Sequence, residues 1–220
     1  MPRNTLTPGQ IVHAAIELLD EQGLDGLNMR SLGQRLGSAA TAVYWHIKTK
    51  DDLVRLAADA VWAEIALPDV SARWRPAATA LATGMHQMCG RHPWLGQAIG
   101  SYLVYGPAKA RYDDRCLALY EKAGFSPADA DRAAATIFVY ALGSALGPAA
   151  RISLTRRLPP EALSEAMTAA RSVGEEFPHV RSRLTTTAGK EYAAAPDDTF
   201  RFGLESILDG FAARLQPVQS

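Results

Sequence analysis

The apolar positions near the start of the chain recur at the three- and four-residue spacing of an amphipathic helix. Behind the segment Thr7-Pro8-Gly9-Gln10 they fall on one face, at Ile11, Ala14, Ala15, Leu18 and Leu19. Thr7 is a capping residue, Pro8 suits the first helical position, and Gln10 completes a capping box. We expect this helix to end at Gly23, because glycine is a common helix terminator.

Residues 28–50 (NMRSLGQRLGSAATAVYWHIKTK) contain two short helical patterns separated by a tight turn. The first begins after the capping residue Asn28 and places on its inner face Met29, Leu32 and Leu36. Gly37 is expected to stop it in the left-handed conformation, and Ser38 to cap the next helix, which runs through Tyr44-Trp45-His46. Two helices joined by a short Gly-containing turn predict a helix-turn-helix, whose second helix fits a major groove.

A fourth helix is predicted from the cap Thr49 to about Ile65, with acidic residues in its first turn that favour the positive end of the helix dipole. Its apolar face carries Leu53, Leu56, Ala57, Ala60 and Val61. We therefore expect a DNA-binding domain at residues 1–50, a connecting helix at 50–65, and a ligand-binding and dimerisation domain at 66–220.

Beyond Ser71 every segment has a helical pattern, and no run alternates with period two for long enough to indicate a strand. The expected helices are 72–90, 93–102, 107–123, 127–150, 159–176 and 197–215. Prolines near the predicted starts are compatible with first-turn positions. Residues 179–195 are rich in Thr, Ala, Gly and Arg and predict a loop. The fold class is therefore all-α, a three-helix head followed by a helical body.

Two of the predicted helices, 127–150 and 197–215, carry long apolar stripes. Both stripes are compatible with ordinary core within one chain. They are equally compatible with a two-fold interface in which two helices from each subunit form a four-helix bundle. The residues that would form this homodimer interface are Ile137, Ala141, Phe200, Leu204, Ile207, Leu208 and Phe211.

Composition excludes several classes of protein. The chain has 220 residues, 48% of them hydrophobic, and equal numbers of basic and acidic residues, so indiscriminate binding to nucleic acid is not expected. Residues 28–50, however, contain four Lys or Arg and no Asp or Glu, which suits one basic face. No long apolar run and no signal-peptide core are evident, and Cys89 and Cys116 suggest buried thiols in a reducing cytoplasm.

No enzyme motif accompanies these helices. A Gly-rich phosphate loop, an HExxH or GxSxG sequence and a paired Cys motif are all missing, and neither His86 nor His92 has a neighbour at metal-ligand spacing. We therefore expect no catalytic residues, no metal and no cofactor. The alternatives left open are a helical enzyme and a helical interaction protein that does not bind DNA.

The sequence TAVYWHIKTKDDLV, with the preceding ELLDEQGLDGLNMRSLGQRLG, resembles the tetracycline-repressor (TetR) family of bacterial transcriptional regulators. The resemblance covers residues 7–65 well, and beyond Ser71 it lies only in the all-helical layout. It implies a cytoplasmic homodimeric repressor that binds a palindromic double-stranded DNA operator and is released by a small molecule. An activator of the same family is an alternative.

The resemblance also implies which residues contact DNA. Arg30 matches a position that reaches a base edge or a phosphate, and Ala40 and Thr41 match base-contacting positions of the recognition helix. Both are small residues that offer little hydrogen-bond readout, which leaves the operator sequence open. Phosphate contact or packing within the head is implied for Tyr44, Trp45 and His46, and phosphate contact at a helix N-terminus for Lys50. We expect Lys48 to contribute a nonspecific electrostatic attraction.

A small-molecule site in the helical body is the remaining implication. Aromatic, Met and His side chains that suit an apolar pocket, or else ordinary core, are Met85, His86, Met88, Trp94, Tyr102, Tyr105, Tyr112 and Phe138. The resemblance implies that magnesium–tetracycline binding would require a histidine after the 93–102 helix. The segment YGPAKARYDD at residues 105–114 has none, so we expect a different effector.

Overall fold

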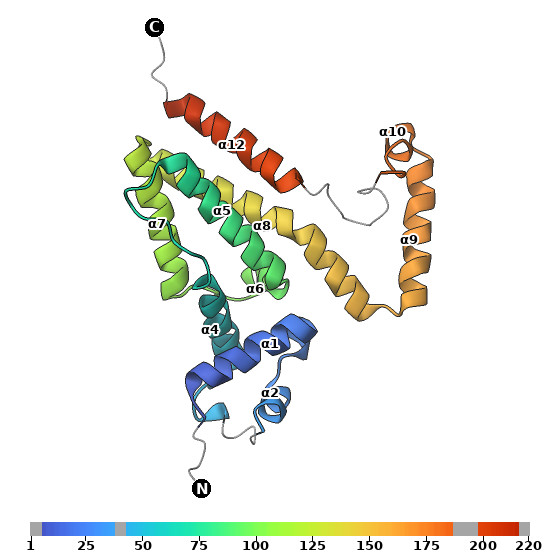
Figure 1. Ribbon diagram of the computed structural model, residues 1–220. Helices are drawn as coiled ribbons and strands as arrows, with labels where there is room; N and C mark the ends of the chain where they lie inside the picture. The colour runs from blue at the N-terminus through green and yellow to red at the C-terminus, as the bar shows by residue number, and fades with distance from the viewer. Residues whose placement is uncertain (1–5, 38–42, 187–197, 216–220) are drawn as a thin grey trace.

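The computed structural model describes residues 6–37, 43–186 and 198–215. Within these ranges all regular structure is helical, which confirms the predicted all-α class. Figure 1 shows three regions: α1 and α2 at one end, a bundle of α5–α8 and α12, and α9 with α10 set apart from the bundle. We call α1, α2 and the described residues up to Thr49 the head, the bundle the body, and α9 with α10 the arm.

Helix α1 (Pro8–Gly26) begins as predicted, because the Thr7 side chain accepts a hydrogen bond from the Gln10 backbone amide and the Gln10 side chain accepts one from the Thr7 backbone amide. Gly23 has φ of +71° and interrupts the helix, so its regular part ends where glycine predicts. The buried face of α1 includes Ile11, Ala14, Ala15, Leu18 and Leu19, the apolar positions read from the sequence.

Helix α2 (Met29–Arg35) is held by Asn28, whose side chain accepts from the amides of Arg30 and Ser31. Gly37 has φ of +61°, the left-handed conformation expected after the helix. The predicted start of the recognition helix, including Ala40 and Thr41, lies outside the described residues. Beyond it, Val43 and Ile47 are buried in the head.

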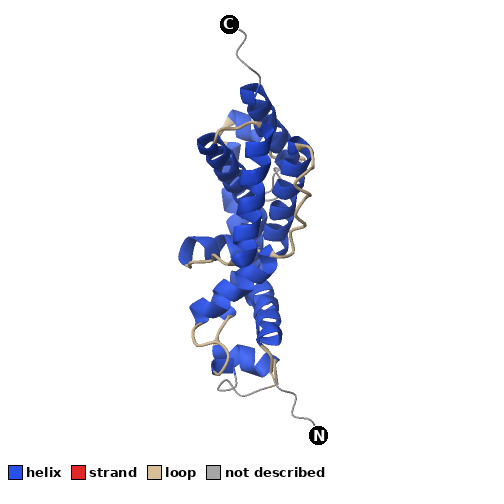
Figure 2. Cartoon of the chain, turned by 90° about the vertical axis from the view of Figure 1, so that its left-hand side faces the viewer, coloured by secondary structure: helices blue, strands red, loops and turns tan. Residues whose placement is uncertain are grey.

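Helix α4 (Lys50–Trp62) joins head and body. The Thr49 side chain accepts from the Asp52 amide, as predicted, and the helix ends three residues earlier than expected, followed by a turn that buries Ile65. One side of α4 packs against α1, and the other contacts α5 (Trp74–Arg91), α6 (Trp94–Ser101) and α7 (Pro107–Ala123). In Figure 2 the head and α4 form the narrow end of an elongated molecule.

Helix α8 (Pro127–Arg157) is the centre of the body and packs against α5, α6, α7 and α12. The prediction that it ends at residue 150 was wrong, because the helix continues to Arg157, with Pro148 inside it. A proline removes one backbone hydrogen bond and can kink a helix without ending it. Beyond it, Leu154 and Leu158 share an apolar groove with Leu163 and Met167 of α9, a contact that favours continued helix.

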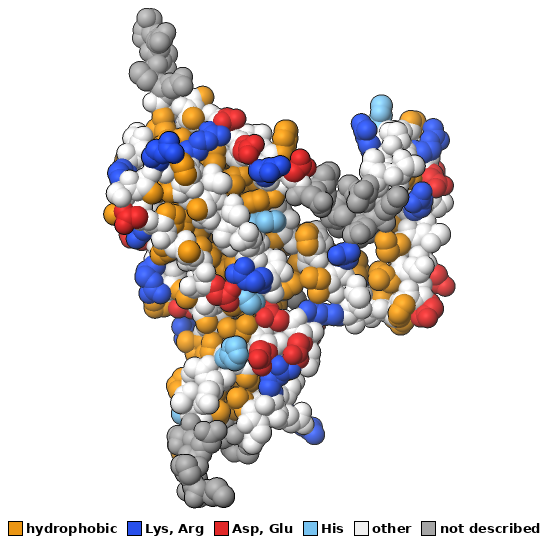
Figure 3. Space-filling view, in the orientation of Figure 1, with side chains coloured by type: hydrophobic (Ala, Val, Ile, Leu, Met, Phe, Trp, Pro, Cys, Tyr) orange, Lys and Arg blue, Asp and Glu red, His pale blue; other side chains and the backbone are white. Residues whose placement is uncertain are grey.

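The arm contains α9 (Pro160–Glu175) and the short α10 (Pro178–Arg181). The predicted loop at 179–195 therefore begins with helical residues, which proline at position 178 helps to start. Nearly all of the side chains of the arm are exposed. Figure 3 shows the arm as a separate lobe, and it shows basic and acidic side chains interspersed over this face of the molecule.

Helix α12 (Thr199–Leu215) lies across α8 and α5. Its first turn is tied to α8 by the Tyr140 hydroxyl, which donates to the carbonyl of Phe200 at 2.9 Å. Near its other end, Phe211 makes edge-on ring contacts with Tyr120 and Phe125 at 6.0 and 5.9 Å. Such aromatic pairs are worth about 0.5–1.5 kcal/mol each beyond the area they bury. Both ends of α12 are thus fixed to the body.

Helix α8 has the length and apolar composition of a membrane-spanning segment, which the sequence reading did not anticipate. Residues such as Ala133, Ile137 and Ala141 are buried against the body, as in the core helix of a helical bundle. Only 22% of its most apolar window is covered within the chain, however. A large apolar part of α8 therefore remains on the surface of the single chain.

Candidate DNA-contacting head and effector cavity

The head presents aromatic and basic side chains at its outer end. Trp45 is 81% exposed and Tyr44 46% exposed, and His46 and Lys48 beside them are also exposed. The Lys48 ammonium lies 5.8 Å from the centre of the Trp45 ring. Trp45 does not pack in the head core, which was one of its two predicted roles, and its exposure leaves it free to contact a partner.

The basic residues of the head differ in how free they are. Arg30 is exposed at the start of α2. Arg35 is paired with Glu17 at 3.0 Å and with Glu21, and hydrogen bonds to these carboxylates raise the pKa of Arg35. The fold thus places two carboxylates of α1 next to residues 28–50, a segment that contains no Asp or Glu of its own.

Lys50 was predicted to be a phosphate contact, and the structure places its ammonium in a bond within the protein. Its Nζ donates to the Leu24 carbonyl at 2.6 Å. This bond joins the first turn of α4 to the end of α1, where a positive charge is favoured by the helix dipole. Lys50 therefore has a structural role in the head, whatever else it contacts.

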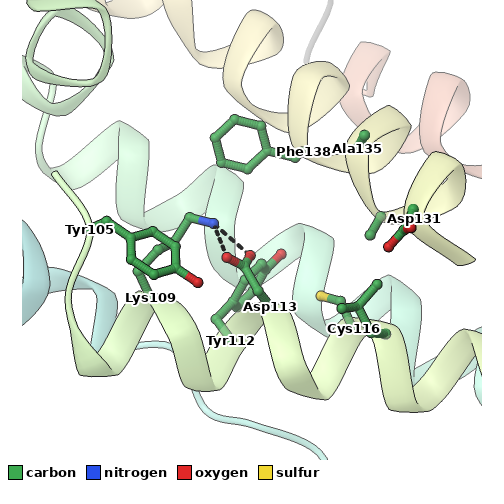
Figure 4. A pocket seen from close by; sticks show the side chains of 10 residues that line it. Tyr105, Lys109, Tyr112, Asp113, Cys116, Asp131, Ala135 and Phe138 are labelled. Carbon is green, nitrogen blue, oxygen red and sulfur yellow. Dashed lines mark hydrogen bonds and ion pairs between the residues drawn. The ribbon is translucent and has the colours of Figure 1, made fainter. Parts of the chain in front are cut away.

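A cavity of about 340 Å³ lies in the body between α7 and α8 (Figure 4). Three of the residues predicted to bind a ligand line it: Tyr105, Tyr112 and Phe138. Sequence reasoning missed the charged residues that join them, namely Lys109, Asp113 and Asp131. Burial raises the pKa of the Cys116 thiol, which also lines the cavity, to about 12, so this cysteine is a neutral wall group.

The other residues predicted to bind a ligand do not line this cavity. Met85 and Met88 are fully buried core, and Tyr102 is half-buried at the end of α6. His86 stacks on Phe200 of α12 with ring centres 4.0 Å apart, and burial lowers its pKa. For these positions the alternative reading, ordinary packing at helical spacing, describes the structure.

The predicted interface residues divide in a similar way. Ile137, Ala141, Leu204 and Leu208 are buried inside their own chain and offer no surface to a partner. Phe200, Ile207 and Phe211 are half-buried. The large apolar side chains exposed on the same two helices are Val139, Leu146 and Phe202. Helices α8 and α12 do carry apolar faces, but the sequence could not show which part of each face is buried in the body.

Comparison with known proteins identifies the family to which this architecture belongs. Residues 11–57 match the family model described as bacterial regulatory proteins, tetR family, and residues 67–215 match that of the tetracyclin repressor-like C-terminal domain. The chain belongs to the tetR family of bacterial regulatory proteins. It is thus a transcriptional regulator of the helix-turn-helix type, as its TAVYWHIKTKDDLV segment predicted.

Several known transcriptional regulators are similar to this chain. An HTH-type transcriptional regulator of Saccharopolyspora erythraea is 39% identical over 140 residues, which are 63% of this chain and 59% of that relative. The class A tetracycline repressor of Escherichia coli is 29% identical, with 95% of this chain and 92% of the repressor covered. A possible TetR family regulator from Streptomyces coelicolor A3(2) has a crystal structure that matches with a TM-score of 0.74 at 26% identity, covering 94% and 98% of the two chains. The matching family models and the relatives named here are those of transcriptional regulators, a class of proteins distinct from enzymes.

The junction between head and body in this TetR-family chain is polar, which sequence reasoning did not foresee. His92, just after α5, is buried, and its two ring nitrogens lie near Asp20 of α1 and Glu64 beyond α4. Trp94, one of the predicted ligand residues, donates its indole N–H to Asp20 at 2.8 Å. Trp94 thus fastens α6 to α1 rather than contacting a ligand in the cavity.

The part of the chain that the structure describes contains no group of three or more His, Cys, Asp or Glu side chains that could hold a metal ion. His46, which the sequence reading did not regard as a metal ligand, is on the exposed surface of the head.

Proposed function

We propose that the chain is a ligand-responsive transcriptional repressor that binds a palindromic operator as a homodimer and releases it when a small apolar or aromatic effector enters the body. Residues 1–50 would bind the DNA, and residues 66–220 would hold the effector and form the dimer. The names of relatives such as the class A tetracycline repressor support repression over activation.

The observation that carries this proposal is that one helix, α4, serves both regions. At its start, Lys50 is bonded to α1 of the head. At its end, Asp59 accepts the backbone amides of Ala108 and Lys109, at 2.8 and 3.2 Å, and so caps α7 beside the cavity. An effector that moves α7 would therefore move the head through α4. It can shift the equilibrium only by the difference between its affinities for the two states.

The homodimer is supported by the exposed apolar surface of α8 and α12. Val139 is 66% exposed, Leu146 52% and Phe202 73%, on two helices that lie side by side. Two helices from each chain would form a four-helix bundle around a two-fold axis. Such a dimer would present two heads to DNA, and recognition requires them to reach major grooves about 34 Å apart.

Fluorescence anisotropy of labelled DNA tests the proposal. The DNA upstream of the protein's own gene, or a site selected from a random pool, is titrated with protein and compared with a scrambled sequence. We expect specific binding of two chains per site, with an affinity that falls steeply with salt because several phosphates are contacted. Equal weak binding to all sequences after selection would contradict the proposal.

Arg30→Ala is the variant to compare in that assay, since Arg30 is exposed at the start of α2. Arg111→Ala, which removes an exposed arginine from α7 in the body, is the matched control. Loss of operator binding in the first variant with retention in the second would support DNA contact by the head. Loss in neither would contradict it.

A further inference from the structure

The cavity between α7 and α8 already holds a positive charge that belongs to the protein. The Lys109 ammonium lies 4.9 Å from the ring centre of Phe138, 5.0 Å from that of Trp62 and 5.8 Å from that of Tyr105. These rings come from α8, from α4 and from the segment before α7, so they surround the ammonium on several sides. Aromatic faces attract cations through the negative charge of their π electrons.

The carboxylates of the cavity complete this cation site. Asp113 holds the Lys109 ammonium with both oxygens, at 2.5 and 2.7 Å (Figure 4), and the Lys109 side chain is only 13% exposed. Asp131, at the other end of the lining in Figure 4, forms no ion pair within the described residues. The lining therefore carries one positive and two negative charges, which favours a further cation and opposes an anion.

We propose that the effector is a small amphiphilic cation, a molecule with one ammonium group on an apolar or aromatic body. Its ammonium would take the position on the ring faces that Lys109 occupies, next to Asp113, and the Asp131 carboxylate at the other end of the lining would add to the negative potential of the cavity. The volume of about 340 Å³ is at the lower end of the range of ligand sites, so the molecule is compact. This inference rests on the proposed function and specifies its effector.

Displacement of Lys109 connects this binding to the head. The backbone amide of Lys109 is one of the two that Asp59 of α4 accepts, and its ammonium lies over Trp62 of the same helix. A ligand that moves the lysine side chain off these rings removes the contact with Trp62 of α4 that is made by the same residue whose backbone amide Asp59 caps. The Lys109 ammonium thus occupies the cation site in the absence of an effector, and the effector replaces it there.

Three probes with the same ring system and different charges test the inference. Isothermal titration calorimetry of the full chain without DNA compares (2-naphthylmethyl)trimethylammonium, 2-naphthylacetate and 2-naphthaleneethanol. We expect the cation to bind about tenfold more tightly than the alcohol, as a desolvated cation–π contact allows, and the anion to bind most weakly. Tightest binding of the anion, or no preference for the cation up to millimolar concentration, would overturn the inference.

Two variants locate the binding in this cavity. Asp131→Asn removes one negative charge of the lining at an exposed position and should weaken binding of the cation by up to about fivefold, as exposed charges do, with little change for the alcohol. Lys109→Met removes the resident charge and should tighten binding of the cation, whereas Arg111→Met, on the exposed face of the same helix, should have no effect. Circular dichroism checks that each variant is folded.

An unchanged affinity in Asp131→Asn, or a loss of cation binding in folded Lys109→Met, would overturn the inference. Two measurements distinguish this inference from the proposed function. Binding of the probe without DNA decides the nature of the ligand, and release of operator DNA by the same probe decides whether the ligand regulates. A cation that binds in the cavity but leaves DNA binding intact would support the cation site and contradict the effector response of the proposed function.

Discussion

His92 Nδ1 and Asp20 Oδ1 lie 2.8 Å apart across the junction between body and head. The same Asp20 oxygen accepts the indole N–H of Trp94, and the other ring nitrogen of His92 lies 3.1 Å from Glu64. One buried imidazole thus links α1, the segment beyond α4, and the turn between α5 and α6. Its charge state affects how firmly the head is attached.

The attachment should depend on pH. Burial alone would lower the pKa of His92, but its hydrogen bond and charge interaction with Asp20, together with those of Glu64, outweigh burial and raise it. Arg91, which pairs with Glu64 at 2.7 Å, and Arg156, which donates to the Asp20 carbonyl, are the cations nearby. Because the folded state binds the proton more tightly, this stabilisation is complete below the unfolded pKa of about 6.5 and is lost as pH rises through the folded pKa.

Urea unfolding of the native chain and of His92→Gln measures this effect. The free energy of unfolding should differ more between the two at about pH 6 than at about pH 8.5. A pH-independent difference for His92→Gln would show that the imidazole acts only by packing.

Gly106→Ala should destabilise the contact between α4 and α7. A Cβ atom at this position would lie 2.5 Å from Asp59 Cγ and would push that carboxylate away from the amides it caps. Overpacking of this kind costs about 1–3 kcal/mol, measured as the free energy of unfolding in urea. Gly90→Ala in α5 meets no atom within 4 Å. It should be neutral or stabilising by up to about 1 kcal/mol, so equal effects of the two would contradict the prediction.

Lys50→Ala should lower the stability of the folded chain, whether or not Lys50 also contacts DNA. It removes the charged donor to the Leu24 carbonyl, and such hydrogen bonds are worth about 1.5–3 kcal/mol. Lys48→Ala is the matched control, because Lys48 is exposed two residues away. A fall in the urea midpoint for Lys50→Ala with none for Lys48→Ala is expected, and the reverse order would be inconsistent with the structure.

Phe202→Glu should weaken self-association without unfolding the chain. Phe202 is 73% exposed on α12, so a carboxylate there costs little in the single chain but would be buried in the proposed bundle. Sedimentation equilibrium should show a shift toward monomer. Leu103→Glu, at an 84% exposed position after α6, is the control. An unchanged dimer in Phe202→Glu would place the interface elsewhere.

The two cysteines should react slowly while the chain is folded. Burial raises the pKa of Cys89 to about 11 and that of Cys116 to about 12. The reactive thiolate at pH 8 is therefore a fraction of about a thousandth or less. Labelling with a chromogenic disulfide should be more than about a hundredfold slower in buffer than in urea. Fast labelling of either thiol in buffer would reveal local opening.

The sequence predicted the features that depend on local chemistry. The caps at Thr7, Asn28 and Thr49 and the left-handed Gly37 follow from side-chain hydrogen bonds and backbone sterics within a few residues. The same reasoning did not find the end of α8, because the groove that Leu154 and Leu158 share with Leu163 and Met167 of α9 favours helix beyond the predicted end. Local rules cannot include that contribution.

The site was only partly predictable for a related reason. Tyr105, Tyr112 and Phe138 were identified as apolar rings at helical spacing, but Met85 fits the same description and is buried core. Lys109 carries the most specific information about the cavity. Its position under three rings depends on how α4, α7 and α8 come together, and no spacing in the sequence encodes that arrangement.

The head is attached to the body at two places, since α4 packs on the bundle and α1 packs on α6. Because both contacts hold it, the head cannot rotate freely about either one of them. A motion of the head that kept both attachments would be a tilt about the line that joins them, and it would carry the outer surface at Trp45 through an arc. A small rotation at the junction would produce a larger displacement at the far end of the head, so in the proposed dimer the spacing between the two heads would change while the buried contacts hardly move.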